Sequence, residues 1–196
     1  MLKIGITGGI GSGKSVVAEI FRLHHIPVFD ADTQAKNLND TSPNIRAKLT
    51  EAFGAEIYKN NKLDRKKLAQ LIFNNQENLR RANSIIHPEL ANHFSQWAQT
   101  QSGYPMVAID AAVLFEAGFH AYVHKTITVL SPLETRIRRI AARDNLSREQ
   151  IESRIHSQMS DEEKVKLSDF VIVNDNKHSL LRQVAEIIET VHVEFS

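Results

Sequence analysis

Gly8-Gly9-Ile10-Gly11-Ser12-Gly13-Lys14-Ser15 decides the fold, because it fits the phosphate-loop pattern G-x-x-x-x-G-K-[ST] without a substitution. The apolar run from Leu2 to Ile6 before it predicts a buried strand, and the run from Val16 to Phe21 after it predicts a helix. Glycines let a backbone wrap closely around phosphate, and the free N–H groups at a helix start favour its negative charge. The sequence therefore predicts a nucleoside triphosphate site.

The side chains of this loop have expected tasks. Lys14 can reach the β- and γ-phosphates, and the Ser15 hydroxyl can coordinate the Mg²⁺ that they carry. A glycine-rich turn that binds nothing is the alternative, and the Lys14-Ser15 pair between a strand and a helix argues against it. The residues expected to contact ATP in this stretch are Gly9, Gly11, Ser12, Gly13, Lys14, Ser15 and Val16.

Composition limits the classes of protein that remain. The chain has 196 residues, 42% of them hydrophobic, which is enough for one α/β domain with an insertion. A net charge of +1 favours neither nucleic acid nor an anionic membrane as a partner. The absence of cysteine excludes disulfides and thiolate metal sites and fits a reducing compartment. With no signal peptide and no apolar run near the roughly 20 residues of a membrane helix, we expect a cytoplasmic monomer.

Four more apolar runs predict strands, at residues 26–29, 106–110, 125–130 and 170–173. Helical patterns lie between them, so the sequence predicts an α/β fold of the P-loop kinase type, a single domain over residues 1–196. Its parallel sheet of about five strands is flanked by helices. Asp110 ends one of these strands, where phosphate-loop proteins keep the acid that supports Mg²⁺ directly or through water.

Two acids follow the second strand, in Asp30-Ala31-Asp32. Ligands of open parallel sheets bind at the carboxyl ends of the strands, which is also where the glycine loop lies. Either carboxylate is therefore a candidate base for an incoming hydroxyl group. Asp32 has a second interpretation, because it can cap a helix that begins at Thr33. Spacing alone leaves both interpretations open.

Residues 40–103 predict a helical insertion. One helix is expected from Ser42-Pro43 to Phe53, closed by Gly54, and another from Lys62-Leu63-Asp64-Arg65. A third amphipathic pattern covers residues 79–97, with a break or kink expected at His87-Pro88. The size and place of the insertion predict a subdomain that binds the phosphoryl acceptor.

The stretch from Ser131-Pro132 to Arg143 predicts an arginine-rich helix. At 100° per residue, three arginines fall within about 60° and can converge on phosphate oxygens. The core-facing residues are expected next to them, and one arginine points away. These are Arg136, Arg139 and Arg143 on the phosphate side, Leu133, Ile137 and Ile140 on the core side, and Arg138 outside.

A capping box, Ser147-Arg148-Glu149-Gln150, opens the next predicted helix. The helical hairpin over residues 139–167 predicts a mobile lid near the carboxyl edge of the sheet. Its closure would shield the γ-phosphate from water and bring the arginines to it.

From Ile4 to about the final helix, the chain resembles the dephospho-coenzyme A kinase family. The phosphate loop alone is shared by very many proteins, but the set of motifs is specific. The marks of the resemblance are Thr7 to Ser15, Asp30-Ala31-Asp32, Lys62-Leu63-Asp64-Arg65, His87-Pro88, Leu114-Phe115-Glu116, Arg143-Asp144-Asn145-Leu146-Ser147-Arg148 and Ser157-Gln158-Met159.

The resemblance implies phosphorylation of the ribose 3′-hydroxyl of dephospho-CoA by ATP with Mg²⁺, giving CoA and ADP. It implies Asp32 as the base, Asn174 as an adenine contact and Arg143 as the lid arginine. The resulting expected sites are, for catalysis, Asp32, Lys14, Arg139 and Arg143; for the acceptor, Thr7, Asp32, His87, Leu114 and Glu116; for ATP, the loop residues with Arg143 and Asn174; and for the metal, Ser15 and Asp110.

Two positions depart from the family pattern. Ala111-Ala112 stands where the family usually has Val-Pro, and Val173 replaces the usual acid before Asn174. Two other classes of nucleotide-binding protein compete with this family. A sibling kinase for a nucleoside monophosphate or a small alcohol should lack the Asp-Ala-Asp and the insertion in this arrangement. A switch GTPase should carry an Asn/Thr-Lys-x-Asp motif after the fourth strand, where Leu130-Ser131-Pro132 stands.

Overall fold

The computed structural model describes residues 1–73 and 75–195. By their contacts the residues form two compact units, one of Met1–Phe29 with Thr100–Ser196 and one of Asp30–Gln99. Each unit has an apolar core of its own.

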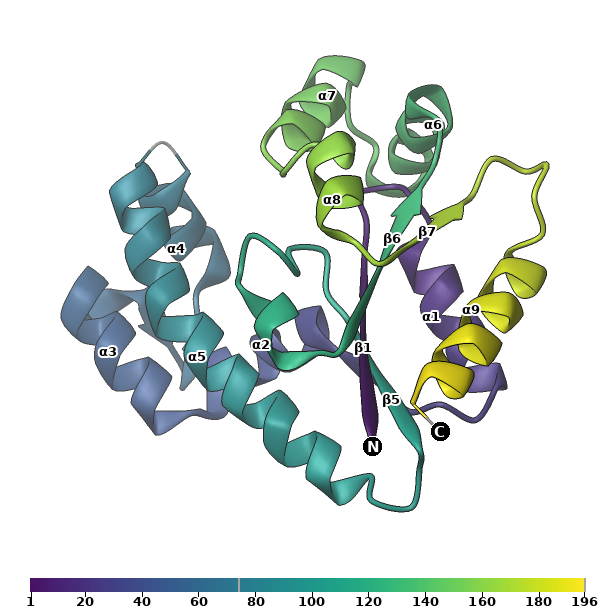
Figure 1. Ribbon diagram of the computed structural model, residues 1–196. Coiled ribbons are helices and arrows are strands. Elements are labelled where there is room, and N and C mark those ends of the chain that lie inside the picture. Colours follow the sequence, from purple (N-terminus) through teal and green to yellow (C-terminus); the bar gives the residue numbers. More distant parts are fainter. Residues whose placement is uncertain (74, 196) are drawn as a thin grey trace. The chain divides into compact units, whose positions relative to one another are not determined.

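The first unit is built on a five-stranded sheet (Figure 1) of the predicted α/β class. Ile6 of the central strand lies opposite Asp110 on one side and Ile127 on the other, in parallel register. The strands stand in the order β2-β5-β1-β6-β7, with bounds β1 (Leu2–Thr7), β2 (Val28–Asp30), β5 (Met106–Asp110), β6 (Lys125–Leu130) and β7 (Phe170–Val173). Connections leave β1 and β6 in opposite directions. The carboxyl edge between them is therefore the topological switch point at which open α/β sheets bind ligands.

Helices α1 (Lys14–Leu23) and α9 (Leu180–Glu194) lie side by side and pack on one face of this sheet (Figure 1). Phe21 of α1 and Val184 of α9 are fully buried against strand residues such as Ile4. Burial of this apolar surface, at roughly 25 cal/mol per Å², holds the strand before the phosphate loop and the helix after it in place.

Of the remaining helices of the first unit, one short 3₁₀ helix precedes β6 and three α-helices lie between β6 and β7. The capping box predicted at Ser147–Gln150 is present and opens α7. The bounds of these helices are η2 (Phe119–Tyr122), α6 (Leu133–Asp144), α7 (Arg148–His156) and α8 (Asp161–Leu167).

The second unit is mainly helical. Its helix α3 begins at Pro43 and ends before Gly54, as predicted. Its core is formed by Ile45, Leu49, Ile57, Leu63 and Leu68. Its helices are α2 (Ala31–Thr41), α3 (Pro43–Phe53), η1 (Ala55–Ile57), α4 (Arg65–Ile72) and α5 (Gln76–Thr100).

A small antiparallel hairpin interrupts the second unit, where the sequence predicted only helix. Its strands are β3 (Tyr58–Lys59) and β4 (Lys62–Leu63). The turn consists of Asn60 and Asn61 with φ angles of 50° and 62°. Asparagine tolerates this left-handed conformation better than most residues, and two-residue hairpin turns require it. The following helix begins at Arg65 with Asp64 as its N-cap, at the end of the stretch predicted to start it.

Helix α5 runs through Pro88 without interruption, so the break expected at His87-Pro88 does not occur. Proline removes one hydrogen bond of the helix ladder. Burial of Ala82 before it and of Leu90 and Phe94 after it holds the helix together. Although α5 has 25 residues, none of the described helices is both long and apolar enough to cross a membrane.

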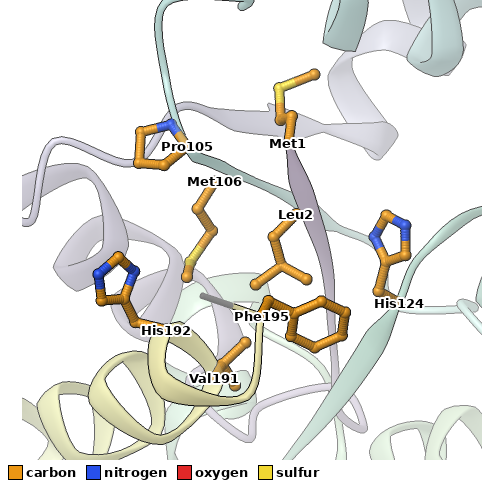
Figure 2. Close-up of a pocket in the computed structure, with 8 residues that line it drawn as sticks. All are labelled: Met1, Leu2, Pro105, Met106, His124, Val191, His192 and Phe195. Carbon is orange, nitrogen blue, oxygen red and sulfur yellow. The ribbon is translucent and has the colours of Figure 1, made fainter.

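A cavity of about 310 Å³ lies where β1 and β5 begin, at the end of these strands away from the phosphate loop (Figure 2). His124 lines it, and its Nδ1 accepts a hydrogen bond of 2.9 Å from the Lys3 N–H. Burial and the charge of Lys3 lower the pKa of His124 below its ordinary 6.5. The cavity is lined by Met1, Leu2, Pro105, Met106, His124, Val191, His192 and Phe195.

Because the pKa of His124 is lowered, we expect the stability of the protein to depend on pH through this residue. The folded state binds a proton at His124 less readily than the unfolded state does. The contribution of His124 to the free energy of unfolding is therefore fully present above pH 6.5 and is lost as the pH falls below it. His124→Gln retains an acceptor without titrating. Its melting temperature should therefore fall less than that of the wild type between pH 7 and pH 5, measured by circular dichroism. Equal slopes for the two proteins would contradict this assignment.

Candidate active site

The phosphate loop joins β1 to α1 at the switch point. Its turn is closed by a hydrogen bond of 3.0 Å from the Ser12 N–H to the Gly9 carbonyl. Gly13 precedes α1 with φ 93°, a left-handed conformation that glycine adopts without strain. The first N–H groups of α1, on Lys14 and Ser15, have no acceptor within the helix, which leaves them for an anion.

Three glycines of the motif also make room for neighbouring elements. A Cβ at Gly9 would overlap the guanidinium group of Arg136, and one at Gly13 would overlap the amide of Asn174. A Cβ at Gly11 would lie 3.0 Å from the Arg136 carbonyl oxygen. The glycines thus allow α6 and the residue after β7 to approach the outside of the loop.

Lys14 forms an ion pair with Asp110, the last residue of β5. The pairing of β1 with β5 places this carboxylate beside the loop, since Asp110 lies opposite Ile6. Both side chains are largely buried, with 12% and 9% of their surfaces exposed. The structure therefore brings together two groups predicted separately, the cation for the phosphates and the acid for the metal.

Ser15 and Asp110 supply a hydroxyl and a carboxylate oxygen, which are the hard donors that Mg²⁺ prefers. Mg²⁺ in kinases usually takes one or two such protein ligands, with water and substrate phosphates completing its shell. Ser12 adds an observation of the same kind, because its buried Oγ has no hydrogen-bond partner among the described residues. These donors fit a magnesium–nucleotide complex.

The arginines of α6 separate into different environments. The guanidinium group of Arg139 lies 3.3 Å from the carbonyl oxygens of Gly11 and Ser12. Arg136 is 4% exposed and also reaches the loop, whereas Arg138 is exposed as predicted. Arg143 differs from the predicted convergence, since its fork binds both carboxylate oxygens of the adjacent Asp144 at 2.7 and 2.9 Å.

The expected core-facing residues of α6 are only partly correct. Ile137 and Ile140 are buried and pack with Ile151 of α7. Leu133 is 49% exposed, so its predicted burial is wrong. It stands at the first position of the helix, and the apolar cluster begins one turn later.

Asn174 follows β7 and is 7% exposed. Its Nδ2 donates to the Ser12 carbonyl at 2.7 Å, and its Oδ1 accepts from Arg139 at 3.3 Å. In this structure the side chain therefore braces the phosphate loop. An adenine contact by Asn174 stays a prediction.

Three residues predicted for the acceptor side lie in or beside the turn after β5. Thr7 is fully buried and donates to the Ala112 carbonyl at 3.2 Å, and Leu114 is fully buried. Glu116 accepts from Lys164 of α8 at 2.7 Å and from the Met159 N–H at 3.2 Å. Sequence reasoning missed Lys164, which is fully buried, because a lysine in a charged helix is usually exposed.

The start of α2 distinguishes Asp30, the last residue of β2, from Asp32. Asp30 is the N-cap of α2, accepting from the Thr33 N–H at 3.0 Å and from its hydroxyl at 2.7 Å. The interpretation of Asp32 as the cap is therefore wrong. Asp32 is exposed in the first turn of α2, and its side chain makes no hydrogen bond or ion pair with another described residue. His87 is half-buried in α5, and burial lowers its pKa below 6.5.

Comparison with known proteins decides the family. Residues 2–179 match the family model described as "Dephospho-CoA kinase". The chain belongs to the dephospho-CoA kinase family. A dephospho-CoA kinase of Bacteroides fragilis is 42% identical over 187 residues, which cover 95% of this chain and 91% of that protein. One of Porphyromonas gingivalis is 42% identical over 195 residues, covering 99% and 96%.

Solved structures agree with this family. A dephospho-CoA kinase from Campylobacter jejuni has a TM-score of 0.70 at 26% identity and covers 99% of this chain and 98% of that one. A crystal structure from Thermus thermophilus has a TM-score of 0.81 at 35% identity and covers 100% and 98%. Shikimate kinase from Acinetobacter baumannii, at 15% identity and a TM-score of 0.55, shares the fold.

Lys14→Ala should reduce turnover by roughly 10²–10³-fold, because the positive charge expected at the β- and γ-phosphates is lost. It should also lower the melting temperature, since the mostly buried Asp110 loses its ion-pair partner. Adding Asp110→Asn should restore the melting temperature but not turnover, as measured by ADP release and thermal unfolding. The matched control is Lys166→Ala, which removes an exposed lysine from α8. Normal turnover by folded Lys14→Ala would contradict the site.

Proposed function

We propose that the chain transfers the γ-phosphoryl group of ATP to the ribose 3′-hydroxyl of dephospho-CoA, with Asp32 receiving the proton. Family membership supplies the reaction, which is the final step of coenzyme A biosynthesis. The observation that carries the residue assignments is the Lys14–Asp110 pair at the end of β5, beside the free N–H groups of α1. These groups meet at the sheet edge where a triphosphate would lie.

The reaction is tested by measuring ADP release with dephospho-CoA, adenosine monophosphate and shikimate as acceptors. Turnover is expected only with dephospho-CoA. Dephospho-CoA without its 3′-hydroxyl should give none, because the attacking oxygen is absent. Turnover of shikimate at a comparable rate would contradict the acceptor assignment.

The phosphate loop and Lys14 would hold and neutralise the triphosphate. Phosphoryl transfer asks mainly for positioning and charge stabilisation, because little covalent chemistry falls to the protein. Ser15 and Asp110 would hold Mg²⁺, which neutralises phosphate charge when it is bound. Lys14 would exchange its contact with Asp110 for the β- and γ-phosphates.

Asp32 is proposed as the base because it is the free acid of the pair. The carboxylate of Asp30 caps the start of α2, whereas the side chain of Asp32 is exposed and unpaired among the described residues. A loose transition state asks little of the base until late in the transfer, so an ordinary carboxylate is sufficient.

Asp32→Asn should lower turnover by roughly 10²-fold or more, since it keeps the shape of the side chain and removes its basicity. The affinity for ATP should change little. The matched control is Asp30→Asn, because asparagine caps helices about as well as aspartate. Steady-state kinetics and thermal unfolding on both variants check this. If Asp30→Asn lost turnover and Asp32→Asn kept it, the two roles would be reversed.

Arg139 and Arg143 are proposed to stabilise charge on the transferring phosphate, with Arg143 serving as the lid arginine. Arg139 already lies against the loop. Arg143 would have to leave Asp144, and its side chain, 64% exposed, is free to turn. Mobility of the lid at residues 139–167 and an adenine contact by Asn174 belong to the same proposal.

Arg139→Ala and Arg143→Ala should each slow transfer by about ten- to a hundredfold, because charge-assisted hydrogen bonds are lost. Arg138→Ala, on the exposed side of the same helix, should behave like the wild type. Lysine at either position should rescue only in part, since a point charge cannot reproduce the planar fork. Measured kcat and KM decide the matter, and equal small effects at all three positions would exclude α6 from catalysis.

The insertion at residues 40–103 is proposed to bind the acceptor, with His87, Thr7, Leu114 and Glu116 contributing. In the second unit Arg65 is not free for this task, since it binds Asp40 at 2.7 Å and the Lys36 carbonyl at 3.0 Å. We also propose that the chain works in the cytoplasm as a monomer without a nucleic-acid or membrane partner. Its cysteine-free composition supports the first of these statements.

A further inference from the structure

Ile10, in the middle of the phosphate loop, is held from the outside by three separate contacts. Its N–H donates to Oε1 of Gln158 at 2.8 Å. Its carbonyl accepts from Nε of Arg136 at 2.8 Å. Its side chain packs on the apolar cluster that Ile137 and Ile140 form with Ile151. The backbone N–H and carbonyl groups of Ile10 are thus both hydrogen-bonded to protein side chains.

The two side chains that bind Ile10 come from different segments. Arg136 belongs to α6, and Gln158 lies in the link between α7 and α8. Arg136 joins these segments, because its NH1 also pairs with Asp161 of α8 at 2.7 Å. The side chain of Arg136 is only 5% exposed, so solvent screens this pair little. Loop, α6 and α8 are therefore tied together at Ile10.

We propose that Gln158 and Arg136 are positioning residues that fix the phosphate loop in its nucleotide-binding shape through Ile10. A phosphate loop binds well only if its N–H groups already point inward, because ordering them on binding costs affinity. Holding both backbone groups of Ile10 prevents the loop from turning these N–H groups away. Because linkage is reciprocal, a bound nucleotide would in turn stabilise the link between α7 and α8.

The surroundings of the two side chains make them suitable for mutation. Arg136, Gln158 and Asp161 line a cavity of about 570 Å³ between α6, α7 and the start of α8. The cavity is large enough to admit water, and the polar groups of Arg136, Gln158 and Asp161 on its wall can hold it there. Removing the amide of Gln158 should therefore leave a folded protein with a less well fixed loop.

The test compares two glutamines that make the same kind of bond. Gln158→Met keeps a side chain of nearly the same length but loses the acceptor for the Ile10 N–H. Gln150→Met is the matched control, because Gln150 accepts from the Ser147 N–H at 3.0 Å in the same helical hairpin without reaching the loop. Binding of ATP with Mg²⁺ is measured by titration calorimetry without acceptor, and turnover and melting temperature are measured in parallel.

The Kd for ATP should rise about three- to tenfold in Gln158→Met, the range expected for one hydrogen bond. Once ATP is saturating, kcat should change less than Kd. In Gln150→Met only the melting temperature should fall. An ATP affinity within twofold of the wild type in folded Gln158→Met, or equal losses in both variants, would overturn the proposal.

A second variant tests the other half of the contact. Arg136→Lys keeps a positive charge for Asp161 but cannot donate from Nε to the Ile10 carbonyl, so it should also weaken ATP binding. Because both changes act on Ile10, the double variant should lose less affinity than the product of the two single losses. Strictly multiplicative losses would mean that the residues act separately and would contradict a shared role.

The inference rests on the proposed use of ATP, but the measurements separate the two. If the wild type bound ATP and failed to phosphorylate dephospho-CoA, the proposed function would fail while the binding comparison would still be decisive. If the wild type were active and Gln158→Met bound ATP normally, only the positioning role would fail.

Discussion

Close packing between α6 and the phosphate loop is the constraint on which the rest of the first unit depends. A side chain at Gly9 would overlap Arg136, and one at Gly13 would overlap Asn174. The glycines of the motif are therefore required by packing against the protein as well as by phosphate binding. The contact is possible because α6 follows β6, the direct neighbour of β1 in the sheet. The arginine-rich helix and the glycine loop therefore form one structural element, although more than a hundred residues separate them in the chain.

Much of the fold was predictable because it depends on local patterns. The strands at residues 106–110, 125–130 and 170–173 have the predicted bounds, since apolar runs of this length between helices indicate buried parallel strands. The hairpin at Asn60-Asn61 was missed, although two asparagines are a signal for such a turn. Of the break or kink predicted at His87-Pro88, the break does not occur, because packing on both sides of a proline can outweigh one lost hydrogen bond, and that packing is not visible in the sequence.

The site was predictable to a lesser degree, because its contacts join distant segments. Asp110 and Lys14 were both expected at the sheet edge, but their ion pair follows only from the strand order. Which of Asp30 and Asp32 caps the helix depends on where α2 begins. The sequence predicted a start at Thr33, whereas α2 begins two residues earlier, at Ala31. The contacts of Gln158 and Lys164 leave no periodic signal in the sequence, since they join segments that lie far apart in the chain.

Such contacts explain why a departure from the family pattern can be harmless. Ala112 stands where the family usually has proline. Its backbone carbonyl accepts hydrogen bonds from Thr7 at 3.2 Å and from Lys164 at 3.0 Å. Proline offers the same carbonyl, so either residue can serve. At Val173 the side chain of Gln183 binds the backbone N–H at 2.8 Å and the carbonyl at 3.0 Å. An acid in place of valine would leave both bonds intact. At both positions the hydrogen bonds therefore involve the backbone groups and not the side chain that differs from the family pattern.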